Sequence, residues 1–232
     1  MLTNEIAGIL SASKNHGWVL EPEAKRLFAS AGLEVPKFIW ANRVQEALGF
    51  AEKVGYPLVG KVVSAKVLHK SERNGVVLGM KGEKELAEVF DRFSRIEGFA
   101  GMLVEESVSG LELIIGAKID DQFGPVILLG MGGTGVEIYR DVSLRMAPLT
   151  TRDAETMIQC LKARPLLSGY RGSGAIDLPR LVKMLETFSD IVMEMEKAIE
   201  SIDLNPVICS STRCVIADAR IILRAPEPVS SS

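Results

Sequence analysis

The sequence YPLVGKVVSAKVLHKSERNGVVLG, Tyr56–Gly79, places a polar segment between two short apolar runs. The runs at 58–63 and 76–78 are rich in valine, which favours two strands joined by a loop. Lys61 interrupts the first run, and burying its ammonium there without an anion would be unfavourable. Two interpretations stay open: Lys61 points out of an exposed strand face, or Lys61 and His69 face a phosphate.

The composition is that of an ordinary globular protein, with 47% hydrophobic and 25% charged residues among 232. A net charge of −3 without a basic block argues against a nucleic-acid partner. No apolar run approaches the roughly 20 residues that span a bilayer, and the N-terminal pattern is not that of a signal peptide, so we expect no membrane partner. Three cysteines without a C-x-x-C pair argue against a disulfide framework and a zinc site, and they favour reduced thiols in the cytoplasm.

The order of helical and strand-like patterns indicates an α+β fold rather than a strict βαβ alternation. Helices are expected at 3–13, 21–31, 43–54, 83–96, 151–161 and 178–200. Pro22 and Gly32 bound the second of these, and Asn42 is expected to cap the third. Strands are expected at 35–40, 58–63, 76–78, 102–105, 111–119, 126–129, 136–139 and 145–149, with a final hairpin of 201–208 and 213–219.

A glycine-rich turn follows the expected strand at 126–129. Gly130, Gly132 and Gly135 match the G-x-G-x-x-G pattern of dinucleotide-binding sites. That site needs a helix to begin at the last glycine, whereas residues 136–140 alternate like a strand, so the sequence disfavours it. The glycines are instead expected to allow a close backbone approach or a bulge.

Oxygen-bearing side chains gather near the end of the sequence. Asp203 and Asn205 lie two residues apart and share one face of a strand. Asp218 lies on the returning strand, where a hairpin can bring it beside Asn205. This donor set suits Mg²⁺, which takes one or two protein ligands plus substrate phosphates. Ordinary turn chemistry accounts for the same residues equally well.

These residues, in this order and spacing, resemble ATP-grasp domains. More closely, they resemble the ATP-grasp (β) subunit of ADP-forming acyl-CoA synthetases of the acetate–CoA ligase type, in the succinyl-CoA synthetase superfamily. The resemblance covers about residues 15–223, and its most telling parts are 56–71 and the segments Phe123–Val126 and Arg145–Pro148.

The resemblance implies an ATP-grasp fold with two α/β subdomains and the nucleotide between them. The first subdomain would span about 35–105 and the second about 106–224, with 21–34 packing on the second. Residues 1–20 would form an N-terminal segment and 225–232 a loose tail.

For the nucleotide, the resemblance implies the following roles. Lys61 would contact the phosphates. Glu105 would bind the nucleoside, and the backbone from Glu106 to Val108 would hold adenine. Glu112 would be a second acidic residue beside the nucleotide.

For phosphoryl transfer, Asn205 and Asp218 would hold Mg²⁺. Asp203 stands where relatives often have Glu, which steadies a phosphorylated histidine on an incoming loop. His69 matches a histidine that some members use as a phosphate relay; a solvated loop histidine is the alternative. Arg145 would add positive charge for phosphoryl transfer, or it is an exposed strand residue.

The implied reaction is acyl-CoA + ADP + phosphate ⇌ carboxylic acid + ATP + CoA, passing through an acyl phosphate and a phosphohistidine. The chain would bind Mg-ADP or Mg-ATP and would need a separate CoA-binding α subunit, in an α2β2 heteromer. Two alternatives remain: a stand-alone ATP-grasp carboxylate ligase, and a non-catalytic nucleotide-binding module of an acyltransferase system.

Overall fold

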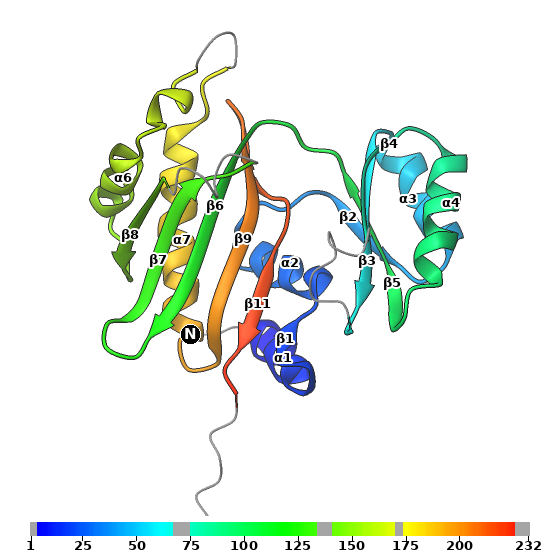
Figure 1. Cartoon of the computed structure of the whole chain (residues 1–232), viewed down its shortest axis with the longest axis horizontal. Helices are drawn as coiled ribbons and strands as arrows, with labels where there is room; N and C mark the ends of the chain where they lie inside the picture. The colour runs from blue at the N-terminus through cyan, green and yellow to red at the C-terminus, as the bar shows by residue number, and fades with distance from the viewer. Residues whose placement is uncertain (1–3, 67–74, 134–140, 170–173, 226–232) are drawn as a thin grey trace, which may run out of the picture. The chain divides into compact units, whose positions relative to one another are not determined.

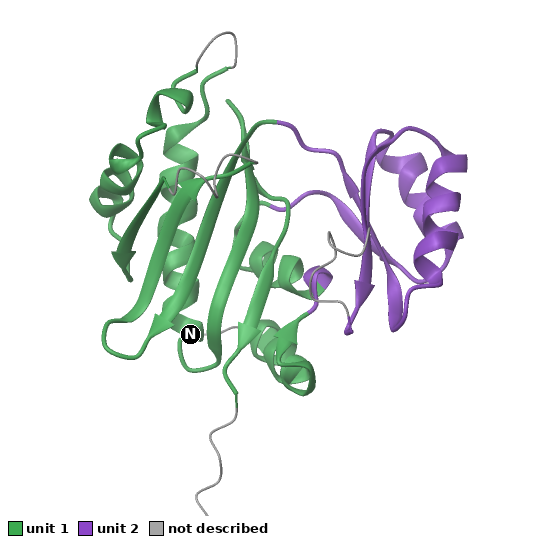
Figure 2. Cartoon of the chain, in the orientation of Figure 1, with its two compact units in different colours: residues 1–19, 23–34, 110–232 green, residues 20–22, 35–109 purple. Residues whose placement is uncertain are grey.

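The computed structural model describes residues 4–66, 75–133, 141–169 and 174–225. Within them the chain forms two compact units (Figure 2). Unit 1 contains residues 1–19, 23–34 and 110–232, and unit 2 contains residues 20–22 and 35–109.

Unit 1 is built on a seven-stranded antiparallel sheet. Its order is β1-β11-β9-β6-β7-β8, and β10 also pairs with β9 (Figure 1). The strands are β1 (Trp18–Val19), β6 (Leu111–Asp120), β7 (Gly124–Met131), β8 (Val142–Met146), β9 (Ile199–Cys209), β10 (Cys214–Ile216) and β11 (Arg220–Leu223).

Helices cover one face of this sheet. In Figure 1, α7 (Leu178–Met195) runs behind the strands and contacts β7, while α6 (Thr151–Cys160) contacts β8. The predicted 3.6-residue pattern of α7 is confirmed, because its repeating apolar side chains are buried: Leu181, Met184, Leu185, Phe188, Val192 and Met195. In the described part of the unit, the other helices are α1 (Asn4–Ser13), η1 (Lys14–His16), α2 (Glu21–Ser30), whose first two residues belong to unit 2, and η3 (Arg164–Leu166).

On the opposite face of the sheet, no helix in the described part of unit 1 packs along β6 and β7. Along β6, side chains alternate between buried positions on the helix side and more exposed positions on the other side, which we call the open face. Ile114, Gly116, Val126, Leu128 and Asp203 line a cavity of about 560 Å³ on this open face.

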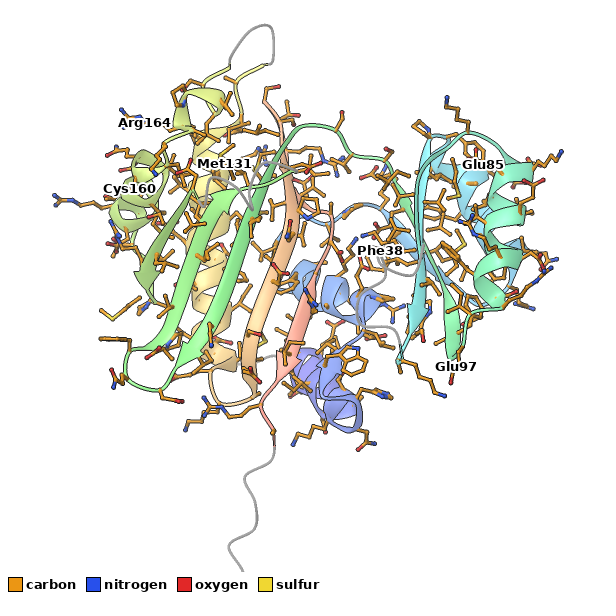
Figure 3. All side chains as sticks on the ribbon, viewed as in Figure 1. Phe38, Glu85, Glu97, Met131, Cys160 and Arg164 are labelled. Atoms are coloured by element: carbon orange, nitrogen blue, oxygen red, sulfur yellow. The ribbon has the colours of Figure 1, made fainter. Side chains whose placement is uncertain are left out.

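Unit 2 is a smaller two-layer structure. Its antiparallel sheet has the order β2-β5-β3-β4, and helices α3 and α4 pack on one face. The elements are β2 (Phe38–Ala41), α3 (Val44–Val54), β3 (Leu58–Ser64), β4 (Val76–Met80), α4 (Glu83–Ser94) and β5 (Phe99–Glu106). Figure 3 shows the side chains that fill the space between this sheet and the two helices, and they form one buried apolar cluster.

Three sequence-based predictions of local structure are wrong. The expected strand 213–219 is two strands, β10 and β11, with a break at 217–219. The long helix ends at Met195 rather than at 200, because Ile199 already pairs with β11. Arg43, not Asn42, occupies the cap position of α3, and its side chain makes no capping hydrogen bond. The expected strand at 136–139 lies outside the described residues.

None of the helices in the described ranges is long and apolar enough to cross a membrane.

Candidate functional site

Lys61 lies in a buried cluster of three charged side chains in unit 2. Its Nζ is 2.6 Å from Glu21 Oε1 and 3.2 Å from Glu105 Oε2. The side chains of Lys61, Glu21 and Glu105 are 7%, 2% and 3% exposed. The interpretation of Lys61 as a lysine on an exposed strand face is therefore wrong, and two carboxylates compensate for the ammonium's lost hydration.

The pairing of β3 with β5 brings this cluster together. Val59 pairs with Glu105 and Lys61 with Leu103, so the lysine and the glutamate lie diagonally on one face of the sheet. This face is opposite to the one on which α3 and α4 pack, because Leu58 and Val62 belong to the helix-side core. Glu21 comes from residues 20–22, the short segment that belongs to unit 2.

The end of β5 carries the other residues expected at the nucleotide. The Glu106 N–H donates to Lys37 O at 2.9 Å, and Glu106 Oε1 accepts from Lys37 N at 3.2 Å. Ser107 N donates to Pro57 O at 3.3 Å. Val108 follows in the irregular link after β5 and is half-buried. The Glu105–Val108 segment is thus held against the starts of β2 and β3.

Asn205 and Asp218 lie on adjacent segments of unit 1. Ile216 pairs with Val207 and Arg220 pairs with Asp203, and the same register continued between them places Asp218 opposite Asn205. The Pro206 carbonyl accepts from the N–H groups of both Ala217 and Asp218, at 3.0 and 3.3 Å, which keeps the two segments adjacent.

A β-bulge shapes β9 at this point. Leu113 pairs with Val207 and Ile115 with Leu204, so Asn205 and Pro206 lie opposite the single residue Ile114. Bulges re-aim side chains and are common beside active sites. Asn205 is exposed here, and Asp218 is half-exposed.

The pair fits a magnesium ion by its donor chemistry. One amide oxygen and one carboxylate oxygen, on adjacent and accessible positions, leave room for the waters and phosphates that Mg²⁺ prefers. The described residues contain no group of three or more His, Cys, Asp or Glu side chains arranged to hold a metal. A site that takes one carboxylate and one amide is consistent with that finding.

Asp203 is paired with a cation that the sequence analysis did not select. Arg220 Nη2 donates to Asp203 Oδ2 at 3.1 Å across the β9–β11 pair. Asp203 lines the open-face cavity together with Gly116 and Lys118. Both members of the ion pair are about one-third exposed or more, so they remain accessible to a ligand.

The structure does not bring Arg145 to these residues. Leu144 faces the open-face cavity, so its neighbour Arg145 points to the helix side of the sheet. There the Arg145 charge helps to lower the pKa of Asp153 at the start of α6, and Arg145 Nη1 donates to Leu144 O at 2.8 Å. Arg145 thus lies on the helix-covered face of β8, and its role in phosphoryl transfer stays a prediction.

Glu112 lies at the start of β6 and is exposed. Its carbonyl accepts from Gly132 N at 2.7 Å, and a Cβ at Gly132 would lie 2.7 Å from the Glu112 carbonyl carbon. Gly132 is therefore required for close backbone contact, as one interpretation of the glycine-rich turn expected. Residues 134–140, which include Gly135, lie outside the described residues, as does His69.

The comparisons with known proteins agree with this arrangement. A family model described as an ATP-grasp domain matches residues 11–223. The β subunit of ADP-forming acetate–CoA ligase I from Pyrococcus furiosus is 35% identical over 213 residues, covering 88% of this chain and 91% of that protein. The β subunit of isoenzyme II from the same organism is 38% identical, covering 89% and 92%.

Some relatives are longer single chains. ADP-forming acetate–CoA ligase I from Archaeoglobus fulgidus is 39% identical over 215 residues, covering 89% of this chain but only 31% of that protein. The chain thus spans almost all of the β subunits and about a third of this longer relative.

Solved structures show the same fold. A Candidatus Korarchaeum cryptofilum acetyl-coenzyme A synthetase 1 with coenzyme A and Ca-AMPCP gives a TM-score of 0.87 at 39% identity, covering 94% of this chain and 99% of that chain. A further structure of that enzyme contains coenzyme A and Mg-AMPPCP, with a phosphohistidine segment pointing towards the nucleotide-binding site; its TM-score is 0.83 at 39% identity, covering 94% and 100%.

The fold is that of an ATP-grasp domain. The chain belongs to the ATP-grasp family, in the group formed by the β subunits of ADP-forming acid–CoA ligases. The expected α+β ATP-grasp fold and the expected family are confirmed.

Sequence reasoning missed two charged residues, Glu21 and Arg220. Arg220 lies two residues after Asp218, so a correct placement of β11 would have put both on one face. Glu21 carried no such signal, because it lies 40 residues before Lys61 at the start of a helix.

Proposed function

We propose that the chain binds Mg-ADP or Mg-ATP and transfers a phosphoryl group between a phosphohistidine and the nucleotide. Together with a CoA-binding subunit it would catalyse acyl-CoA + ADP + phosphate ⇌ carboxylic acid + ATP + CoA. Phosphate cleaves the thioester, which releases CoA and forms an acyl phosphate. The acyl phosphate gives its phosphoryl group to a histidine and leaves as the carboxylic acid. ADP then accepts the phosphoryl group from the histidine and becomes ATP.

The observation that carries this proposal is the placement of Asn205 and Asp218 on adjacent segments beside the Asp203–Arg220 ion pair. Phosphoryl transfer needs positive charge and accurate positioning more than covalent chemistry. When held by Asn205 and Asp218, Mg²⁺ would neutralise phosphate charge. Arg220 supplies a guanidinium that can bind phosphate oxygens as a planar fork, and Arg145 stays proposed as a further positive charge for phosphoryl transfer.

On the nucleotide side, we propose that Lys61 binds phosphate, that Glu105 and the Glu106–Val108 backbone bind the nucleoside and adenine, and that Glu112 lies beside them. The support is the ordered end of β5, fixed by the hydrogen bonds of Glu106 and Ser107. Asp203 would orient the imidazole of a phosphohistidine. A carboxylate that accepts a hydrogen bond from one ring nitrogen keeps the proton on that nitrogen and leaves the other nitrogen to carry the phosphoryl group.

The partner is proposed to be a CoA-binding α subunit, in an α2β2 complex in the cytoplasm. Support comes from relatives that carry the name β subunit, and from longer relatives of which this chain matches about a third. His69 remains proposed as a phosphate relay between the two subunits.

The proposal is tested by ATP formation from acetyl-CoA, ADP and phosphate with the purified chain, with the CoA-binding subunit, and with both. Turnover is expected only with both present, and H69A is expected to abolish turnover while leaving Mg-ADP binding intact. Turnover by this chain alone would favour a stand-alone ligase. Nucleotide binding without phosphoryl transfer in the full mixture would favour a non-catalytic module.

A further inference from the structure

Of the two carboxylates that pair with Lys61, Glu21 is the nearer one, yet no expected role in the reaction includes it. Its carboxylate is 2.6 Å from the ammonium, against 3.2 Å for Glu105. The Glu21 side chain is only 2% exposed. A carboxylate this deeply buried costs hydration free energy that its partner has to compensate, so the pair is a defined feature of the site.

The cluster holds two carboxylates and one ammonium, and phosphate would bring further negative charge to it. Like charges in a poorly hydrated site repel strongly, because the effective dielectric constant is far below that of water. A phosphate that binds Lys61 therefore competes with the carboxylates already there.

The two carboxylates differ in how firmly the backbone holds them. Glu105 lies on β5, which pairs with β2 on one side and with β3 on the other. Glu21 lies on the three-residue segment 20–22, at the first position of α2 and outside the sheet of unit 2. Glu21 is the partner that can leave Lys61 without breaking a strand ladder.

From this we infer that Glu21 is the counter-ion that Lys61 holds while nucleotide is absent and exchanges for a nucleotide phosphate. Glu21 thus acts as a positioning residue that keeps the buried ammonium in place and limits how tightly phosphate binds. The inference rests on the proposed role of Lys61 at the nucleotide.

The test is isothermal titration calorimetry of E21Q with Mg-ADP and with adenosine. The substitution leaves Lys61 with Glu105, so one negative charge is removed from beside the ammonium and the shape of the cluster is kept. We expect Mg-ADP to bind about tenfold more tightly, on the scale of a screened charge–charge interaction, and adenosine to bind unchanged.

Two variants serve as controls. E21D keeps the carboxylate and should restore the wild-type affinity for Mg-ADP to within about twofold. E23Q removes the neighbouring glutamate that pairs with Arg26 at the surface, and it should leave both affinities unchanged.

Thermal unfolding separates counter-ion exchange from a purely structural role. E21Q should melt at a lower temperature without ligand, but saturating Mg-ADP should raise its melting temperature by more than it raises that of the wild type. A merely structural glutamate would lower both melting temperatures equally.

Unchanged or weaker binding of Mg-ADP by E21Q would overturn this inference and leave the proposed function standing. Failure of the wild-type chain to bind Mg-ADP would overturn the proposed function and the inference with it. If E21Q does not fold, a crystal structure of the wild type with Mg-ADP decides. Separation of Lys61 from Glu21 supports the exchange, and an ion pair retained at the same distance contradicts it.

Discussion

The side chain of Lys61 on β3 is only 7% exposed, and its ammonium group pairs with two carboxylates. Removing one member of such a buried group leaves the others uncompensated, which is far more costly than removing a surface pair. The stability of unit 2 therefore depends on the residue that we propose to bind phosphate.

We predict that K61M lowers the free energy of unfolding by about 3–5 kcal/mol, because two buried carboxylates lose their cation. The double variant K61M/E21Q should recover part of this loss, because only one buried carboxylate has then lost Lys61 as its partner. Urea unfolding measures both. The control is K66M, whose exposed pair with Glu97 should be worth about 1 kcal/mol or less. A K61M variant as stable as the wild type would contradict the described ion pairs.

The Asn205–Asp218 pair makes a prediction about magnesium. D218N replaces a charged oxygen ligand by a neutral one, so the Mg²⁺ concentration that half-saturates ADP binding should rise by at least about tenfold. Binding of metal-free ADP should not weaken. D121N, at an exposed carboxylate in the β6–β7 turn, is the matched control and should leave the magnesium dependence unchanged. An unaltered magnesium requirement in D218N would remove Asp218 from the site.

At the scale of elements, α6 begins with a capping box. Thr150 Oγ1 accepts from Asp153 N at 3.2 Å, and Asp153 Oδ2 accepts from Thr150 N at 2.9 Å. We expect T150A to cost about 1 kcal/mol of unfolding free energy at neutral pH.

The hydrogen bond from the Thr150 side chain is the main reason that the pKa of Asp153 is lowered. Because the pKa of Asp153 is lower in the folded state than in the unfolded state, the charged carboxylate stabilises the fold at pH values above the unfolded-state pKa. This stabilisation is lost as the pH falls through the folded-state pKa. The difference in stability between T150A and the wild type should therefore shrink in acid, as urea titrations at neutral and acidic pH will show. A difference that grows in acid would contradict the capping box.

The β9–β10 hairpin carries two buried thiols. Cys209 and Cys214 pair directly across the strands, and a hydrogen bond between them, with burial, raises the pKa of Cys209. We predict that only the exposed Cys160 reacts quickly with a thiol reagent in the native protein at neutral pH, and that all three react after unfolding. Rapid native labelling of Cys209, measured by peptide mass spectrometry, would contradict this packing.

The elements with strong periodicity were predictable from the sequence, and those set by pairing were not. The apolar spacing of α7 and the valine runs of β3 and β4 determine local structure directly. The break at 217–219 depends instead on β9 pairing with two short strands, which no local pattern reveals. The residue types Asn205 and Asp218 could be proposed as oxygen ligands from the local pattern. The side of the sheet on which Arg145 lies depends on strand pairing and could not be predicted.

At the scale of the whole molecule, the residues proposed for the reaction are divided between the two units. Lys61, Glu21 and Glu105 belong to unit 2, while Asp203, Asn205, Asp218 and Arg220 belong to unit 1. Each unit has its own buried core, so the charged groups are placed by two separately packed sheets. No single stretch of sequence therefore contains all the residues proposed for the reaction.

The measurement that tests the central claim most directly is a single-turnover phosphoryl transfer. The CoA-binding subunit would be phosphorylated on histidine with acetyl-CoA and labelled phosphate, freed of small molecules, and mixed with Mg-ADP with or without this chain. We predict that labelled ATP forms, in an amount equal to the phosphohistidine lost, only when this chain is present, and that D218N slows its formation. Labelled ATP formed equally well without the chain, or no transfer with it, would contradict the account.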